Sequence, residues 1–190
     1  SSPDTLQTVL DVQRNTVACT GVETYGIDLW DAHFRVLNNQ VDGCYSGLLT
    51  SVWYGNVTRS DTVMGNVVSV GSAPDLYKVG IGVSGNVAAI VSHNTVSGAA
   101  SGAQQVGLID VSNCPSDAFY YGGCTVDGAN LPTALVDSNS VTGGMVWGIH
   151  AENVDSLDIV GNEVQNLNLA SGAYYLDYEF FGAIAVLKSV

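Results

Sequence analysis

The chain has 190 residues, of which 46% are hydrophobic and only 12% charged, and its formal net charge is −13. This hydrophobic content excludes intrinsic disorder, and the length suffices for one domain with a sizeable core. Nucleic-acid binding is excluded as well, because the five basic residues are too scattered to form a basic patch: Arg14, Arg35, Arg59, Lys78 and Lys188. The acidic balance disfavours polyanionic partners and leaves self-association, neutral glycans or a protein surface. No run of about 18 apolar residues is present, so we expect no membrane span.

A triplet of Asn, any residue and Val recurs along the chain. Its asparagines are Asn15, Asn39, Asn66, Asn94, Asn139 and Asn162. A second motif, Gly followed by an aliphatic residue, precedes most of them at Gly26, Gly47, Gly80, Gly107, Gly148 and Gly182. Two motifs in a common register at this period indicate a solenoid of stacked coils.

In chain order, the first coil is expected over residues 6–20 and contains the first triplet. Residues 25–30 and 34–37 form the next pair of strands, and residues 47–53 and 62–64 the pair after that, with an insertion at 54–61. Residues 79–83 and 87–91 are the most regular pair, joined by a turn at 84–86. Each segment is a short apolar run bounded by Gly, Asn or Ser, which is typical of strands.

The second half repeats the pattern with one large departure. Residues 106–111 precede an insertion at 113–133, and the coil resumes at 134–136. Residues 147–151 and 157–160 form another coil, and 180–187 a partial one within an aromatic C-terminal segment, 174–187. We therefore expect a single domain over residues 1–190.

The triplet also predicts how each coil packs. The valine two residues after each Asn is expected to point inward and form a ladder, because β-branched side chains suit a pleated surface. The Asn is expected in the turn, where it tolerates left-handed backbone angles, and stacked Asn side chains can bond to one another.

On residues 80–96 and 148–164, the pattern Gly-aliphatic followed by Asn-x-Val resembles the coil repeat of the right-handed parallel β-helix, or pectin-lyase-like, superfamily. The resemblance covers residues 6–190 and implies an all-β solenoid of about six to seven coils. It does not identify an activity, because lyases, hydrolases, epimerases, adhesins and phage spikes share this fold.

No catalytic motif of that superfamily is found. Its polygalacturonases show Asn-Thr-Asp, Asp-Asp, Gly-His-Gly and Arg-Ile-Lys, and none of these occurs here. Acid–base hydrolysis needs two carboxyl groups on one face. The best candidates are Asp28 and Asp110, followed by Glu152 with Asp155 and Asp177 with Glu179. At the position two residues after the glycine of each Gly-aliphatic motif, however, the residues are Asp28, Leu49, Gly82, Ile109, His150 and Ile184. No two acids therefore share this position in the aligned coils.

Metal and cofactor sites are also not indicated. His33, His93 and His150 lie far apart in register, which argues against a three-histidine metal site. No loop motif of oxygen ligands supports calcium, and we expect no cofactor.

The four cysteines suggest two disulfides, Cys19–Cys44 between stacked coils and Cys114–Cys124 across a short loop. The alternative is four buried free thiols. Disulfides favour an extracellular, secreted or cell-surface protein, or one from a hyperthermophile. The opening Ser-Ser-Pro-Asp suits a mature protein whose leader has been removed, although a truncated chain would begin in the same way.

Departures from the repeat are the candidate functional positions. Aromatic residues in or near them could bind sugar rings or a protein, or could simply cover the solenoid wall: Trp53, Tyr54, Phe119, Tyr120, Tyr121 and Trp147. Asn56 begins the only N-glycosylation sequon. We expect a non-catalytic extracellular structural or adhesive protein that self-assembles end to end into a filament. The alternatives are a carbohydrate-binding module and a small carbohydrate-active enzyme.

Overall fold

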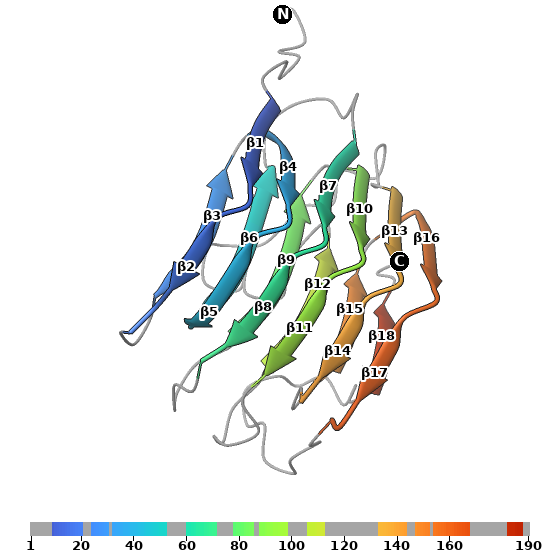
Figure 1. Ribbon diagram of the computed structural model, residues 1–190. Helices are drawn as coiled ribbons and strands as arrows, with labels where there is room; N and C mark the ends of the chain where they lie inside the picture. The colour runs from blue at the N-terminus through green and yellow to red at the C-terminus, as the bar shows by residue number, and fades with distance from the viewer. Residues whose placement is uncertain are drawn as a thin grey trace, which may run out of the picture.

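The computed structural model describes residues 9–20, 24–30, 32–52, 60–71, 78–85, 88–98, 106–112, 133–143, 147–152, 154–167 and 182–187. These residues form three parallel sheets of six strands each, which stack into a right-handed parallel β-helix of six coils, as the sequence predicts (Figure 1). We name the three sheets A, B and C. Every coil contributes one strand to each sheet, first to A, then to B and then to C. The first and last coils therefore lie at opposite ends of the stack.

The strands of each sheet follow one another at intervals of one coil. Sheet A contains β1 (Val9–Gln13), β4 (His33–Leu37), β7 (Ser60–Met64), β10 (Ala88–Ser92), β13 (Thr133–Asp137) and β16 (Ser156–Val160). Sheet B contains β2 (Thr16–Ala18), β5 (Gln40–Cys44), β8 (Val67–Val70), β11 (Thr95–Gly98), β14 (Ser140–Thr142) and β17 (Glu163–Gln165). Sheet C contains β3 (Tyr25–Trp30), β6 (Ser46–Val52), β9 (Lys78–Gly85), β12 (Val106–Ser112), β15 (Trp147–Glu152) and β18 (Gly182–Leu187).

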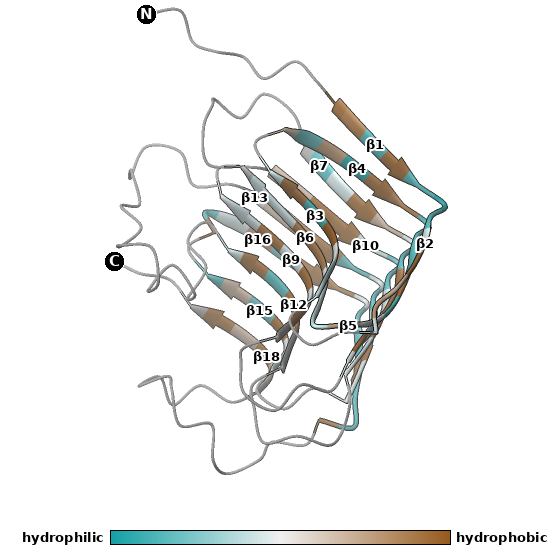
Figure 2. Cartoon of the chain, turned by 90° about the vertical axis from the view of Figure 1, so that its left-hand side faces the viewer, coloured by the Kyte–Doolittle hydropathy of each residue, from teal (hydrophilic) through white to brown (hydrophobic). Residues whose placement is uncertain are grey.

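The core lies between the sheets and is built from columns of aliphatic residues, one from each coil. The predicted valine ladder is confirmed: sheet B pairs Val17, Val41, Val68, Val96, Val141 and Val164 in one column. Its four inner members are at most 1% exposed. Figure 2 shows sheets A and C as two layers joined along one side by sheet B.

The column of glycines marks where sheets B and C approach each other most closely. A Cβ atom added to Gly47 would lie 2.2 Å from Cγ1 of Val68, and one added to Gly80 would lie 2.4 Å from Cγ1 of Val96. The glycine of one coil thus makes room for the ladder valine of the next. This contact explains why the two sequence motifs keep a common register.

The register of two coils differs from the sequence-based alignment. Gly107 pairs with Trp147 and not with Gly148, and Trp147 pairs in turn with Gly182. Leu108, which is fully buried, and Ala183 therefore occupy the places that glycine holds in the other coils. The alignment was wrong by one residue there because a glycine stands directly before the true column position in both coils.

The left-handed residue of each turn is not the ladder asparagine, as predicted, but the residue before it. Its φ lies between 53° and 67° in every coil: Arg14, Asn38, Gly65, His93, Ser138 and Gly161. This backbone angle bends the chain at the corner between sheets A and B (Figure 2), and the following Asn side chain points along the stack.

The two predicted insertions end earlier than expected, because their last residues already belong to strands: β7 begins at Ser60 and β13 at Thr133. The remaining parts of the insertions at 54–61 and 113–133 lie outside the described residues. Of the aromatic segment 174–187, only β18 is described.

Candidate functional site

Five of the six aromatic residues predicted to bind a ligand lie outside the described residues: Trp53, Tyr54, Phe119, Tyr120 and Tyr121. The same is true of Asn56 and of the predicted Cys114–Cys124 pair. Trp147 begins β15, is 5% exposed, and has its ring 4.5 Å from the His150 ring, centroid to centroid. Any ligand of Trp147 would have to reach a buried side chain, and binding there stays a prediction.

His150 forms a buried pair with Asp110 on the outward side of sheet C. The Nδ1 atom of His150 lies 3.0 Å from Oδ1 of Asp110, and the two residues are 2% and 4% exposed. The parallel pairing of β12 with β15 places them directly opposite each other. The pair was missed because the sequence alignment placed Ile109, one residue earlier, beside His150.

This pair is electrically coupled to Glu152, two residues further along β15. Burial lowers the pKa of His150, but its hydrogen bond to Asp110 and the charges of Asp110 and Glu152 outweigh that effect, so the pKa is raised above its ordinary value. Burial raises the pKa of Glu152; His150 opposes this rise and Asp110 adds to it. The raised pKa favours the protonated form of His150, which is hydrogen-bonded to Asp110 and lies two residues from Glu152.

A second buried pair, His33 with Asp61, joins β4 to β7. The Nδ1 atom of His33 lies 3.0 Å from Oδ1 of Asp61, which also accepts a hydrogen bond from the backbone N–H of Phe34 at 3.1 Å. Asp61 belongs to an inward-facing column between Phe34 and Ala89 and is 1% exposed. Burial raises its pKa, although the bonds from Phe34 and His33 partly offset the effect.

Asp28 and Asp110, the first pair of candidate acids, are too far apart to form a hydrolytic pair. Asp28 is exposed and lies in the same column as Asp110, but three strand spacings separate them, or about 14 Å. Two carboxyl groups that hydrolyse a glycosidic bond are at most about 9.5 Å apart. Asp155 lies beyond β15, and Asp177 and Glu179 are outside the described residues. In the described part of the chain, no group of three His, Cys, Asp or Glu side chains could hold a metal ion.

The predicted disulfide between Cys19 and Cys44 is confirmed. It links the segment after β2 to the end of β5, with the Cα atoms 4.8 Å apart. Cys44 is fully buried. The bond therefore ties the first coil to the second at the end of the stack.

The six ladder asparagines form one directional chain of hydrogen bonds. The backbone N–H and the side-chain Nδ2–H of each Asn both donate to Oδ1 of the next: for Asn66, both bonds go to Asn94, at 2.9 and 3.0 Å. The same Nδ2 atom also donates to the carbonyl three residues before the preceding ladder Asn, as Asn66 does to Val36. The chain runs without interruption from Asn15 to Asn162.

The two ends of this ladder are chemically opposite. In the described residues no donor reaches Oδ1 of Asn15, and no asparagine oxygen accepts from Asn162, whose Nδ2 donates to the carbonyls of Val136 and Val160. One end of the stack thus presents an acceptor and the other presents donors.

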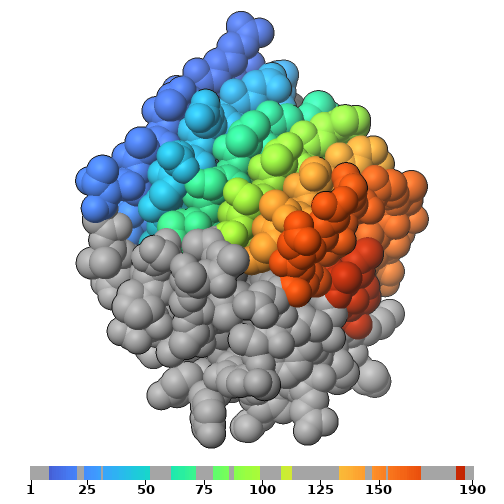
Figure 3. Space-filling view, turned by 60° about the horizontal axis from the view of Figure 1, so that its bottom comes forward, coloured from blue at the N-terminus to red at the C-terminus, as the bar shows by residue number. Residues whose placement is uncertain are grey.

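The apolar core is also open at both ends of the described stack. Leu10 in the first coil is 38% exposed, and Ile184 and Val186 in the last coil are 47% and 57% exposed. The inner residues of the same columns are closed: Phe34, next to Leu10, is 1% exposed, and Ile81 and Val83, in the columns of Ile184 and Val186, are 0% and 2% exposed. Figure 3 shows the coils as successive bands from blue to red, with these two ends furthest apart.

Comparison with protein-family models, curated proteins and solved structures finds no match to this chain. In the residues that the structure describes, no helix is long and apolar enough to cross a membrane.

Proposed function

We propose that this protein is a non-catalytic extracellular structural or adhesive β-helix whose copies associate end to end. The observation that carries the proposal is the exposure of core columns at both ends, while the same columns are closed inside the stack. Exposed apolar surface of this kind is energetically costly and commonly marks a site of association. Open strand edges add backbone groups that a further strand can pair.

The two ends match each other residue by residue. Continuing the register of the stack from the last coil of one copy to the first coil of the next brings apolar residues together in five inner columns. The pairs are Leu157 with Leu10, Ile159 with Val12, Val164 with Val17, Ile184 with Ile27, and Val186 with Leu29. A second copy of the chain is therefore a partner of the right chemistry for either end.

The extracellular location rests on the Cys19–Cys44 disulfide, since such bonds persist in oxidising compartments. The structural rather than enzymatic role is supported by the spacing of Asp28 and Asp110. Adhesion to other surfaces would use the sides of the stack, which end-to-end contacts leave uncovered.

Sedimentation velocity of the purified chain over a range of concentrations tests the proposal. Val186→Lys, which places a charge on the open core, is expected to weaken self-association at least tenfold. Val67→Lys is the matched control, because Val67 is 50% exposed but lies on the outer side of sheet B, away from both ends. A wild-type chain that stays monomeric at millimolar concentration, or equal effects of the two variants, would contradict end-to-end association.

A further inference from the structure

We infer that the copies join head to tail in a single register, in which Asn162 of one copy donates to Oδ1 of Asn15 in the next, and that an aspartate contact in this register sets its salt dependence. The inference rests on the proposed end-to-end association and specifies its geometry. It follows from three properties of the described coils: the direction of the asparagine ladder, the column register and the charges at the ends.

The direction of the ladder selects head-to-tail joining. Two last coils placed together would oppose donors to donors, and two first coils would oppose an acceptor to an acceptor. Only the last coil against a first coil continues the ladder, because the N–H groups of Asn162 then meet Oδ1 of Asn15. Buried polar groups left without partners are costly, so the other two arrangements are disfavoured.

The same continuation supplies a second bond. Inside the stack, Nδ2 of each ladder Asn donates to the carbonyl three residues before the preceding ladder Asn, as Asn39 does to Val12. Across the junction, Nδ2 of Asn15 would donate in this way to the carbonyl of Ile159. A slip of one residue along the strands would place inward residues of one copy beside outward residues of the next, so the apolar columns favour the in-register junction.

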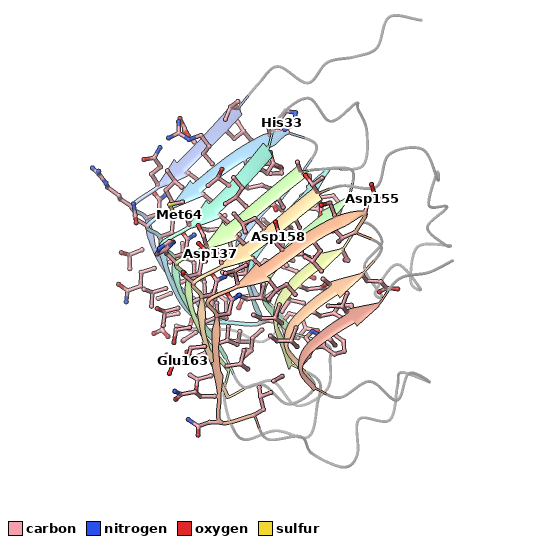
Figure 4. All side chains as sticks on the ribbon, turned by 90° about the vertical axis from the view of Figure 1, so that its right-hand side faces the viewer. His33, Met64, Asp137, Asp155, Asp158 and Glu163 are labelled. Carbon is pink, nitrogen blue, oxygen red and sulfur yellow. A yellow bond between two sulfur atoms is a disulfide. The ribbon has the colours of Figure 1, made fainter. Side chains whose placement is uncertain are left out.

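One outward column brings like charges together at the junction between two copies. It reads Asp11, Arg35, Thr62, Ile90, Leu135 and Asp158 from the first coil to the last. In the head-to-tail register, Asp158 would therefore lie beside Asp11 of the next copy. Figure 4 shows Asp158 on the exposed side of β16, with Glu163 on β17 of the same coil.

The surrounding charges offset this repulsion only in part. Within the same copy, Nε of Arg35 lies 3.4 Å from Oδ1 of Asp11, and both side chains are about half exposed. Arg14 lies in the turn after β1 of the first coil, and Glu163 begins β17 of the last coil. Asp137 lies on sheet A, one coil inward from Asp158. Since each copy also carries a net charge of −13, association is expected to strengthen as salt screens these charges.

A charge-reversal series tests the aspartate contact. Asp158→Lys places an ammonium group beside Asp11 and is expected to tighten association roughly five- to tenfold at low salt. Adding Asp11→Lys to Asp158→Lys should remove that gain, because two lysines then meet. Asp42→Lys, in the second coil, makes the same change in net charge one strand spacing further from the junction and should have a smaller effect.

Cysteine pairing tests the register independently. Gln13 and Val160 share an outward column, so the junction would place their Cα atoms about 4.8 Å apart, within the range that a disulfide spans. Under mild oxidation, a mixture of Gln13→Cys and Val160→Cys proteins should form covalent dimers, and neither protein should do so alone. Asp11→Cys mixed with Val160→Cys, two residues out of register, should link far more slowly.

The outcomes separate the two proposals. Cross-linking of either single variant with itself, or equal effects of Asp158→Lys and Asp42→Lys in chains that do associate, would overturn the register and leave end-to-end association standing. Absence of association in every variant, at high salt as well as low, would overturn both.

Discussion

Asn66 accepts two hydrogen bonds from Asn39 through a single side-chain oxygen, one from the backbone N–H at 2.9 Å and one from Nδ2 at 3.0 Å. Both residues are at most 1% exposed. Because the same contact repeats in every coil, the ladder satisfies the turn backbone without water. Because every ladder asparagine before Asn162 donates toward the last coil, the ladder also makes the two ends of the stack chemically different.

Replacing a central ladder residue should therefore destabilise the protein strongly. Asn66→Ala removes the acceptor for two buried donors of Asn39 and the donors to Asn94, so we expect a loss of about 3–5 kcal/mol in the free energy of unfolding. Asn15→Ala, at the exposed end of the ladder, should cost about 1 kcal/mol. Urea unfolding of the two variants checks the difference, and equal losses would show that the ladder does not carry this stability.

The left-handed turn residues offer a stabilising change. His93 is exposed and has a φ of 55°, an angle that a residue with a Cβ atom adopts at a cost. His93→Gly should raise the free energy of unfolding by up to about 1 kcal/mol. Gly65→Ala, at the equivalent turn position, should lower it, because a Cβ atom there would lie 2.5 Å from Oδ1 of Asn38. Thermal unfolding measured in parallel decides whether the two changes have opposite signs.

Stability should depend on pH through His150. Its pKa in the folded protein is raised above 6.5, so its contribution to stability is fully present below pH 6.5 and is lost as the pH rises through the folded value. The free energy of unfolding should therefore fall as the pH rises from 6 into the alkaline range. In His150→Asn this fall should be smaller, whereas His93→Asn, at an exposed turn, should retain it. An unchanged pH profile in His150→Asn would show that the pair with Asp110 does not hold an extra proton.

Removing the confirmed disulfide should loosen the first coil. The bond closes a loop with a sequence separation of 25, for which chain entropy gives a stabilisation of about 3.5 kcal/mol. Replacing Cys19 and Cys44 by serine should lower the unfolding midpoint accordingly, with first-coil amides losing the most protection in hydrogen exchange. A uniform loss of hydrogen-exchange protection along the chain would contradict this local effect. Peptide mapping of the same variant would show whether Cys114 and Cys124 pair with each other.

The sequence predicts the coil architecture well because the repeat is physically constrained twice, by the ladder asparagine and by the glycine facing the ladder valine. It misplaces two coils where Leu108 and Ala183 replace that glycine. That single shift hid the His150–Asp110 pair, which depends on a side chain from each of two strands. His33 with Asp61 was equally out of reach, because an aspartate in an inward column leaves no periodic signal.

The sequence predicts end-to-end assembly through a partial last coil at 180–187, but it does not tell which side chains are exposed there, because Ile184 and Val186 look like core residues in the sequence. The stack shows that, among the described residues, both have a neighbouring strand only on the β15 side. This difference between a closed column and its exposed end is the basis of the proposed association.

Cryo-electron microscopy of the chain at high concentration and moderate salt tests the central claim most directly. Head-to-tail joining of six-coil units is expected to give rods with an axial subunit repeat of about 29 Å, six strand spacings, and all subunits pointing the same way. Side-by-side dimers, or rods whose subunits alternate in direction, would contradict it.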